Sequence, residues 1–338
     1  MTVDLLTHAL VGLLPVCCFL AALVLMDSYK LVDVRWIVAT IAMGSLVGGG
    51  VSYFAHNPAR DMASVSFSDY TRYFSPFIEE ALKGLIIVVL LYRNRIGFLV
   101  DAAIFGFAVG AGFALIENLY FLQALQDSPI GVWIVRGFGT AIMHGGTTAI
   151  LSVSYRALIR EESRSGIVAF LPGFLVASII HSIFNHFFLS PINNAIAILI
   201  TLPILMAIVY RQSERAVSKW LDVGFDADTE LLELINSGKF STSKVGIYLT
   251  DLKENFVGEI VADLLCYLRV YVELSIRAKG LLMMRESGFA AEVDVETTEK
   301  LAELKYLEGS IGKTGKLAIK PFLQMSRKDL WQFYVLSK

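Results

Sequence analysis

Seven polar side chains that are able to do chemistry stand inside apolar stretches of the chain, where such groups are costly unless they are paired or functional. They are Glu79, Glu80 and Lys83 in FIEEALKG, Glu117 in FALIENLYF, His144 in AIMHGGTTA, and His181 and Asn185 in IIHSIFNHFF. Imidazole and carboxylate groups are ligands that Zn²⁺ takes in catalytic sites, where the metal lowers the pKa of bound water to about 7. A second carboxylate then serves as general base, and an amide or ammonium stabilises the oxyanion. These residue types therefore suit hydrolysis of an amide bond.

Spacing within each helix assigns partners to these groups. Glu79 and Lys83 are four residues apart and Glu80 and Lys83 three, so one ammonium can neutralise either carboxylate. Glu79 and Glu80 are adjacent and point about 100° apart on a helix, which predicts different tasks for the two. His181 and Asn185 are four residues apart and share a helix face.

These considerations give a working assignment. The expected metal ligands are Glu117, His144 and His181, with zinc as the ion. Glu79 is the expected base, Lys83 holds Glu80, and Asn185 completes the catalytic set. The three glutamates could exchange roles, and a metal-free version in which Glu79 and Glu117 activate water directly stays open.

Composition indicates where these groups are placed. The chain of 338 residues is 55% hydrophobic and 18% charged, which is too apolar for an ordinary soluble protein. Only 23 of the first 210 residues are charged, against 37 of the remaining 128. We expect an all-α protein with a membrane helix bundle over residues 1–210 and a mostly helical cytoplasmic domain over 211–338. The net charge of −2 gives no basic field, so nucleic acid is not an expected partner.

Seven stretches are long and apolar enough to span the membrane, which takes about 20 residues in a helix. They are residues 5–26, 35–55, 73–92, 97–124, 132–155, 166–189 and 192–210. Basic residues mark cytoplasmic loops, and here they are Lys30 and Arg35, Arg93 and Arg95, Arg156, Arg160 and Arg164, and Arg211, Arg215 and Lys219. Loops near 126–131 and 189–192 have no Lys or Arg, and the loop with Arg60 and Arg72 is ambiguous. The predicted N-terminus is outside and the C-terminus in the cytoplasm.

The predicted topology places the polar groups at similar depths in the membrane. With this topology Glu79, Glu117, His181 and His144 lie six to twelve residues below the outer ends of four different spans, which is roughly 9 to 18 Å. A shared depth on four helices predicts one site in the outer half of the bilayer.

The second part of the chain carries two amphipathic helix patterns. Apolar residues recur at helical spacing at Val257, Val261, Leu264, Leu268 and Tyr271, and again at Leu301, Leu304 and Leu307. Thr297 or Thr298 is the expected start of the second helix and Gly309 its expected end.

The EEALK run, the FALIEN run, His144 and the HSIFN run together resemble the PrsW family of intramembrane proteases. The resemblance covers roughly residues 70–190. It implies that Glu79 and Glu80 are essential, that Glu117 belongs to the second motif, and that His181 and Asn185 belong to the last. It also implies a multi-pass protein of the bacterial inner membrane that cuts single-span, membrane-anchored proteins such as anti-sigma factors near the outer face.

The CAAX-prenyl endopeptidases are more distantly similar. They have an arginine after the paired glutamates and a histidine in the second motif, where this chain has Lys83 and Glu117. That difference favours the PrsW family over the CAAX-prenyl endopeptidases, and it leaves open whether the site binds a metal.

A proton-coupled carrier is the competing interpretation, because intramembrane acids and histidines also mark ion paths. A carrier commonly shows an inverted repeat, which this sequence lacks, and its polar residues line both leaflets. A third possibility is a catalytically idle scaffold whose cytoplasmic domain carries the function.

Overall fold

The computed structural model describes residues 2–27, 32–50, 66–125, 127–159, 166–237, 243–254, 256–287, 289, 293–319, 323 and 336. These residues form helices and no strand. The chain divides into two compact units, Met1–Ser213 and Glu214–Lys338. Several residues used for the topology prediction lie outside the described residues: Lys30, Arg60, Arg160, Arg164 and the end of the predicted span 35–55.

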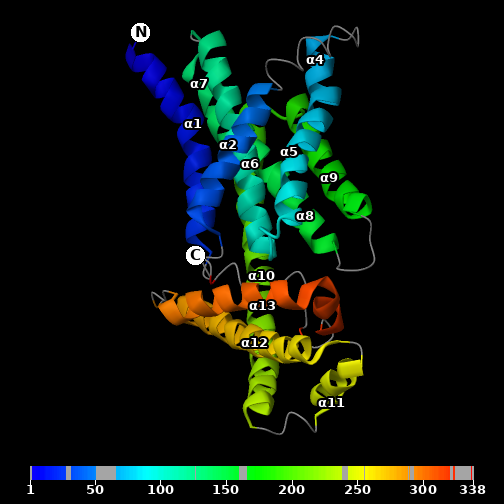
Figure 1. Cartoon of the computed structure of the whole chain (residues 1–338). Coiled ribbons are helices and arrows are strands. Elements are labelled where there is room, and N and C mark those ends of the chain that lie inside the picture. The colour runs from blue at the N-terminus through cyan, green and yellow to red at the C-terminus, as the bar shows by residue number, and fades with distance from the viewer. Residues whose placement is uncertain are drawn as a thin grey trace. The chain divides into compact units, whose positions relative to one another are not determined.

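The first unit is a bundle of long helices (Figure 1). The long helices are α1 (Thr2–Leu25), α2 (Val34–Gly50), α5 (Ser75–Tyr92), α6 (Leu99–Ala124), α8 (Ile142–Leu158), α9 (Gly166–His186) and the first part of α10 (Pro191–Asn236). Two short helices, α4 (Phe67–Asp69) and α7 (Ile130–Ile134), stand before α5 and α8 in the chain. The last span was expected to end at residue 210, but α10 continues without interruption past that residue.

Helix α6 is the centre of this bundle and contacts α1, α2, α5 and α8. It packs closely because its glycines leave no side chain in the way. A Cβ on Gly110 would lie 2.1 Å from the carbonyl oxygen of His144 on α8, and one on Gly112 would lie 2.1 Å from that of Ile41 on α2. The long fourth predicted span is therefore one helix, and its glycines serve close packing.

Two π-helical segments precede α5 and α8, two of the four helices that carry the polar groups. Segment η2 (Tyr70–Phe74) leads into α5, and segment η3 (Val135–Ala141) joins α7 to α8. A π-helix is rare and occurs mostly as a single turn, frequently at functional sites. These two segments set the rotation of α5 and α8 about their axes.

Among the residues that the structure describes, four helical segments are long and apolar enough to cross a membrane: Leu5–Leu25, Leu99–Ala124, Gly166–His186 and Pro191–Val217. Helix α2 is a shorter apolar helix. The predicted spans 73–92 and 132–155 differ from these for physical reasons. Helix α5 carries three charged residues among its 18, and the other span consists of α7, η3 and the 17-residue α8. The count of seven spans stays a prediction.

The second unit contains the end of α10, α11 (Lys244–Asp251), α12 (Gly258–Glu286) and α13 (Val295–Ile319). Helices α12 and α13 confirm the two amphipathic patterns except at their starts: Val257 precedes α12 and is exposed, and α13 begins at Val295 rather than at Thr297 or Thr298. Their buried apolar residues include Leu264, Leu268, Tyr271, Leu274, Leu304, Leu307 and Ile311. The expected end at Gly309 is wrong, because the non-helical residue is Gly312, whose φ of +61° favours glycine, and helix continues after it to Ile319.

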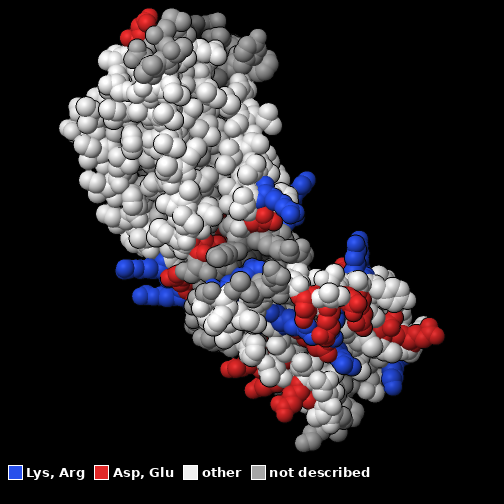
Figure 2. Space-filling view, turned by 90° about the vertical axis from the view of Figure 1, so that its left-hand side faces the viewer, with Lys and Arg blue, Asp and Glu red and all other residues white. Residues whose placement is uncertain are grey.

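Charge separates the two units on the surface as well. In Figure 2 the first unit presents a broad face without Lys, Arg, Asp or Glu, while the second unit carries residues of both signs. Exposed apolar residues of the first unit include Leu10, Leu14, Ile179, Ile183, Ile196 and Ile200. A contiguous exposed surface of this kind is typical of contact with lipid.

Candidate metal centre

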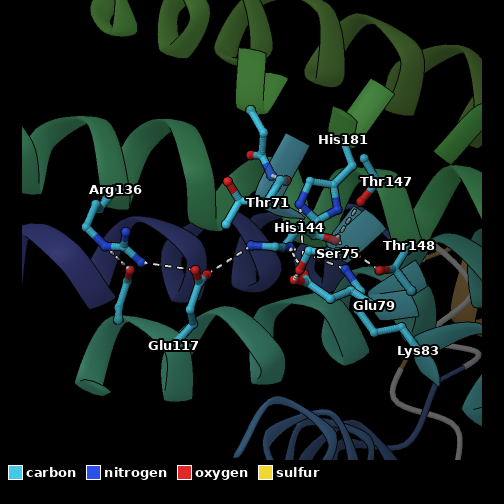
Figure 3. A network of polar contacts seen from close by, with 12 residues as sticks. Thr71, Ser75, Glu79, Lys83, Glu117, Arg136, His144, Thr147, Thr148 and His181 are labelled. Carbon is cyan, nitrogen blue, oxygen red and sulfur yellow. Dashed lines mark hydrogen bonds and ion pairs between the residues drawn. The ribbon is translucent and has the colours of Figure 1, made fainter. Parts of the chain in front are cut away.

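Three ligand-type residues from three helices meet inside the first unit. Glu79 of α5, His144 of α8 and His181 of α9 each offer one ligand atom, and these atoms all lie within 4.8 Å of one another. All three residues are buried, with 6%, 2% and 1% of their surface exposed. Figure 3 shows their side chains pointing toward one another between the helices.

His144 is held by a carboxylate on one nitrogen. Its Nε2 lies 3.0 Å from Oε2 of Glu117, and its Nδ1 lies 3.3 Å from Nζ of Lys83. A carboxylate accepts and an ammonium donates, so the two contacts agree that Nε2 carries the hydrogen and Nδ1 carries the lone pair. That Nδ1 faces Oε2 of Glu79 at 4.0 Å.

His181 has the corresponding arrangement on the other side. Its Nδ1 lies 3.0 Å from Oε1 of Glu80, and its Nε2 faces Oε2 of Glu79 at 3.8 Å. Glu80 is completely buried and also accepts hydrogen bonds from Lys83, Thr147 and Thr148. His181 therefore donates to a fixed carboxylate and presents its remaining lone pair to Glu79.

Glu79 has one oxygen occupied and one free. The Ser75 hydroxyl donates to Oε1, while the buried Oε2 has no hydrogen-bond partner among the described residues. A buried carboxylate oxygen without a donor is costly, and here it faces the two imidazole lone pairs. A cation at this point would satisfy Oε2 of Glu79 and Nε2 of His181, and would replace Lys83 as the partner of Nδ1 of His144.

The donor set fits a divalent metal. Two neutral imidazoles and one carboxylate are a common catalytic set for zinc, and ligand atoms in a tetrahedral zinc site lie about 3.3 Å apart. The separations of 3.8 and 4.0 Å from Glu79 are close to that spacing. Each histidine also donates its other N–H to a carboxylate, as metal-binding histidines generally do.

The formal charges of the surrounding side chains are compatible with a bound cation. Three carboxylates, Glu79, Glu80 and Glu117, stand against two cations, Lys83 and Arg136, in the connected network. With both histidines neutral the cluster carries one net negative charge, which a bound cation offsets.

The family comparison agrees with this geometry. A model of the PrsW family of intramembrane metalloproteases matches residues 33–210, which is more than half of the chain. The chain belongs to this family. No curated protein and no solved structure matches it. The PrsW match covers all three helices that supply Glu79, His144 and His181.

Among the described residues of this PrsW protein, Glu117 is not one of the three whose ligand atoms converge. Its carboxylate is on the far side of the His144 ring from Glu79, since it contacts Nε2 while Glu79 faces Nδ1. It also lies 3.4 Å from the guanidinium of Arg136. The described residues thus bring Glu79, and not Glu117, to the point that the two histidines share.

Asn185 is also set apart from the three-residue group. Its Nδ2 donates to the carbonyl oxygen of Thr71 at 2.9 Å, and Ser182 donates to the carbonyl oxygen of Arg72 at 2.6 Å. Both acceptors belong to η2, so these side chains tie α9 to the segment that leads into α5. The structure gives Asn185 a contact that positions two helices.

Lys83 and Glu80 form the pair that their spacing predicted, at 2.5 Å. Sequence reasoning missed other members of the network: Ser75, Thr147, Thr148 and Arg136. The three hydroxyl residues carry no distinctive signal. Arg136 did carry one, because a charged residue inside a predicted span is unusual enough to indicate a role.

Proposed function

We propose that this protein hydrolyses peptide bonds of single-span membrane proteins, anti-sigma-factor-like in architecture, near the extracytoplasmic face of the bacterial inner membrane. The observation that supports it best is the point shared by Glu79, His144 and His181, where a free carboxylate oxygen meets two imidazole nitrogens. We infer that these three residues hold the metal ion, with zinc as the expected one. Glu79 thereby takes the ligand role first expected for Glu117.

Glu80, Glu117 and Lys83 surround the three proposed ligands and hold them in place. A bound zinc ion supplies a Lewis acid and lowers the pKa of water. Because Oε2 of Glu79 is a ligand in this arrangement, it does not act as the base first expected of it, and the oxygens of Glu80 and Glu117 are held at the other nitrogens of the histidines. Lys83 Nζ, 3.3 Å from His144 Nδ1, is placed to stabilise negative charge that develops on a substrate carbonyl oxygen.

Access to the site follows from its surroundings. The centre is buried within the bundle, and we infer that a partner approaches laterally from the lipid because the exposed surface of the first unit is apolar. A substrate helix has to unwind locally, because its peptide groups are already hydrogen-bonded within the helix. We place the N-terminus outside, seven spans in the membrane and residues 211–338 in the cytoplasm, an orientation that rests on the basic loops.

The test uses the full-length protein reconstituted in liposomes with tagged single-span substrates. We expect cleavage by the wild type and none by Glu79→Gln or His181→Gln. The matched control is His186→Gln on the same helix, since His186 contacts the Ser182 carbonyl and belongs to no ligand group among the described residues. Cleavage that persists in both site variants would refute the proposal. Solute flux that they abolish, with no cleavage ever observed, would favour the carrier.

A further inference from the structure

Arg136 is anchored beside the metal centre without touching it. It lies on η3, where its Nε donates to Oδ1 of Asn118 at 2.9 Å and its guanidinium lies 3.7 Å from the centroid of the Phe121 ring. Asn118 in turn donates to the Gly12 carbonyl on α1 at 2.8 Å. The guanidinium is thus held by Asn118 and the Phe121 ring, and its Nη2 forms an ion pair with Oε1 of Glu117 at 3.4 Å without a hydrogen bond.

The two histidines are supported by matching chains of contacts. On one side Lys83 pairs with Glu80, and Glu80 accepts from His181. On the other side Arg136 pairs with Glu117, which accepts from His144. Figure 3 shows the second chain running from Arg136 through Glu117 to His144. In each series of contacts a cationic side chain pairs with a carboxylate, and that carboxylate accepts a hydrogen bond from the imidazole of a histidine ligand.

We propose that Arg136 is a positioning residue for the metal centre. It holds Glu117 so that Oε2 faces Nε2 of His144, which directs Nδ1 of His144 to the ligand point. The side chains of Arg136 and Glu117 are only 13% and 21% exposed, so their contact is largely shielded from water. Without the guanidinium, Glu117 keeps a single partner and is free to turn toward the accessible side.

The contacts of Arg136 show that it lies beside the ligand residues and is not one of them. Arg136 reaches Glu117 and Asn118, but among the described residues it has no contact with Glu79, His144 or His181. Its effect therefore passes through Glu117. Removal of such an outer contact typically lowers metal affinity 10- to 100-fold.

The inference rests on the proposed function for its metal readout. Zinc affinity of the full-length protein in detergent is measured by competition with a chelator. We expect Arg136→Gln to bind zinc 10- to 100-fold more weakly than the wild type. Arg136→Lys keeps the charge and loses the Nε donor to Asn118, so a fall of about three- to tenfold is expected. The control is Arg156→Gln, because Arg156 lies on α8 and donates to the Gly97 carbonyl instead.

A second readout needs neither metal nor proteolysis. In protein labelled with ¹⁵N-histidine, the Nε2–H proton of His144 is identified by its loss in His144→Gln. We expect a hydrogen-bonded signal in the wild type and in Arg156→Gln, and its loss or upfield shift in Arg136→Gln. If Arg136→Gln does not fold, Arg136→Lys decides by the same two measurements.

These outcomes separate the two proposals. An Arg136→Gln protein with wild-type zinc affinity and an unchanged His144 signal would overturn the role of Arg136. If the wild type binds no zinc, the metal part of the proposed function fails, and the His144 signal alone decides on Arg136. Loss of that signal then supports the positioning role, and its persistence refutes it.

Discussion

The imidazole rings of His144 and His181 stand at 89° to each other, with their centroids 4.7 Å apart. This perpendicular arrangement directs Nδ1 of the first ring and Nε2 of the second toward the same carboxylate oxygen of Glu79. The other nitrogen of each ring contacts its own glutamate. Glu79 therefore faces both histidines, whereas Glu80 contacts His181 and Glu117 contacts His144.

Glu79 and Glu117 are expected to differ in their effect on metal content. Glu79→Ala removes a ligand, so we expect no stoichiometric metal by elemental analysis of detergent-purified protein. Glu117→Ala removes only the support of His144, so metal binding should persist with affinity lowered 10- to 100-fold. The opposite order, with Glu117→Ala metal-free and Glu79→Ala fully loaded, would restore Glu117 as the ligand.

Lys83 is expected to be needed for stability as well as activity. Lys83→Met leaves Glu80 charged in a completely buried position, which costs about 3–5 kcal/mol when one partner of a buried pair is removed. Thermal unfolding in detergent should show a much lower midpoint. The double variant Lys83→Met/Glu80→Gln should recover part of the loss, and a single variant as stable as the wild type would contradict this prediction.

Gly110 is expected to tolerate no side chain. A Cβ there lies 2.1 Å from the His144 carbonyl oxygen, so Gly110→Ala forces α6 and α8 apart, at about 1–3 kcal/mol or more. It also moves Glu117 away from His144, so cleavage should fall more than stability alone predicts. Gly131→Ala is the matched control, because no atom lies within 4 Å of its added Cβ. Equal melting temperatures for the two variants would be inconsistent with this packing.

Asn185 is expected to affect geometry rather than the ligand set. Asn185→Ala loses the hydrogen bond to the Thr71 carbonyl, so α9 and η2 are held less firmly, by the Ser182 hydrogen bond and the contact between the Tyr73 and His186 rings. We expect reduced cleavage with zinc affinity within about threefold of the wild type. Ser182→Ala should behave similarly, since it removes the neighbouring bond to Arg72. Complete loss of zinc in Asn185→Ala would instead make it part of the first coordination sphere.

In the second unit, Glu273 makes stability depend on pH. Burial alone would raise the pKa of Glu273, but hydrogen bonds from Lys300 and Arg269 outweigh it and hold the pKa below its ordinary value. A carboxyl group with a lowered pKa contributes stability above its unfolded pKa and loses it as pH falls through the folded pKa. Hydrogen exchange of α12, corrected for intrinsic rates, should show weaker protection at acidic pH. Lys300→Met should reduce that pH dependence, and an unchanged profile would argue against it.

The convergence of these residues on one site was predictable, because the place of a residue along a membrane-spanning helix determines its depth in the membrane. At 1.5 Å per residue, Glu79, Glu117, His144 and His181 had to lie at similar levels once the spans were drawn. Their meeting in one polar network follows from the cost of leaving such groups alone in an apolar interior. The pairing of Glu80 with Lys83 was likewise fixed by their spacing on one helix.

The division of labour within the network was not predictable, because it depends on rotation about the helix axes. Segment η3 precedes His144, and its π-helical turn alters which face of α8 meets α6. Glu117 consequently reaches Nε2 of His144 from behind the ring, and Glu79 faces Nδ1. No motif in the sequence marks where a π-helical turn begins, so the roles of the two glutamates could not be told apart.

The two π-helical segments also bear on how this region tolerates changes in chain length. Removing a single residue from η2 or η3 would turn the helix that follows by about 100°. Such a deletion would swing Glu79 or His144 out of the centre while leaving every ligand present in the sequence. A homologue one residue shorter here would thus retain all four motifs in order and still lack an assembled centre. The number of residues in η2 and η3 is as much a determinant of activity as the identity of the ligands that follow them.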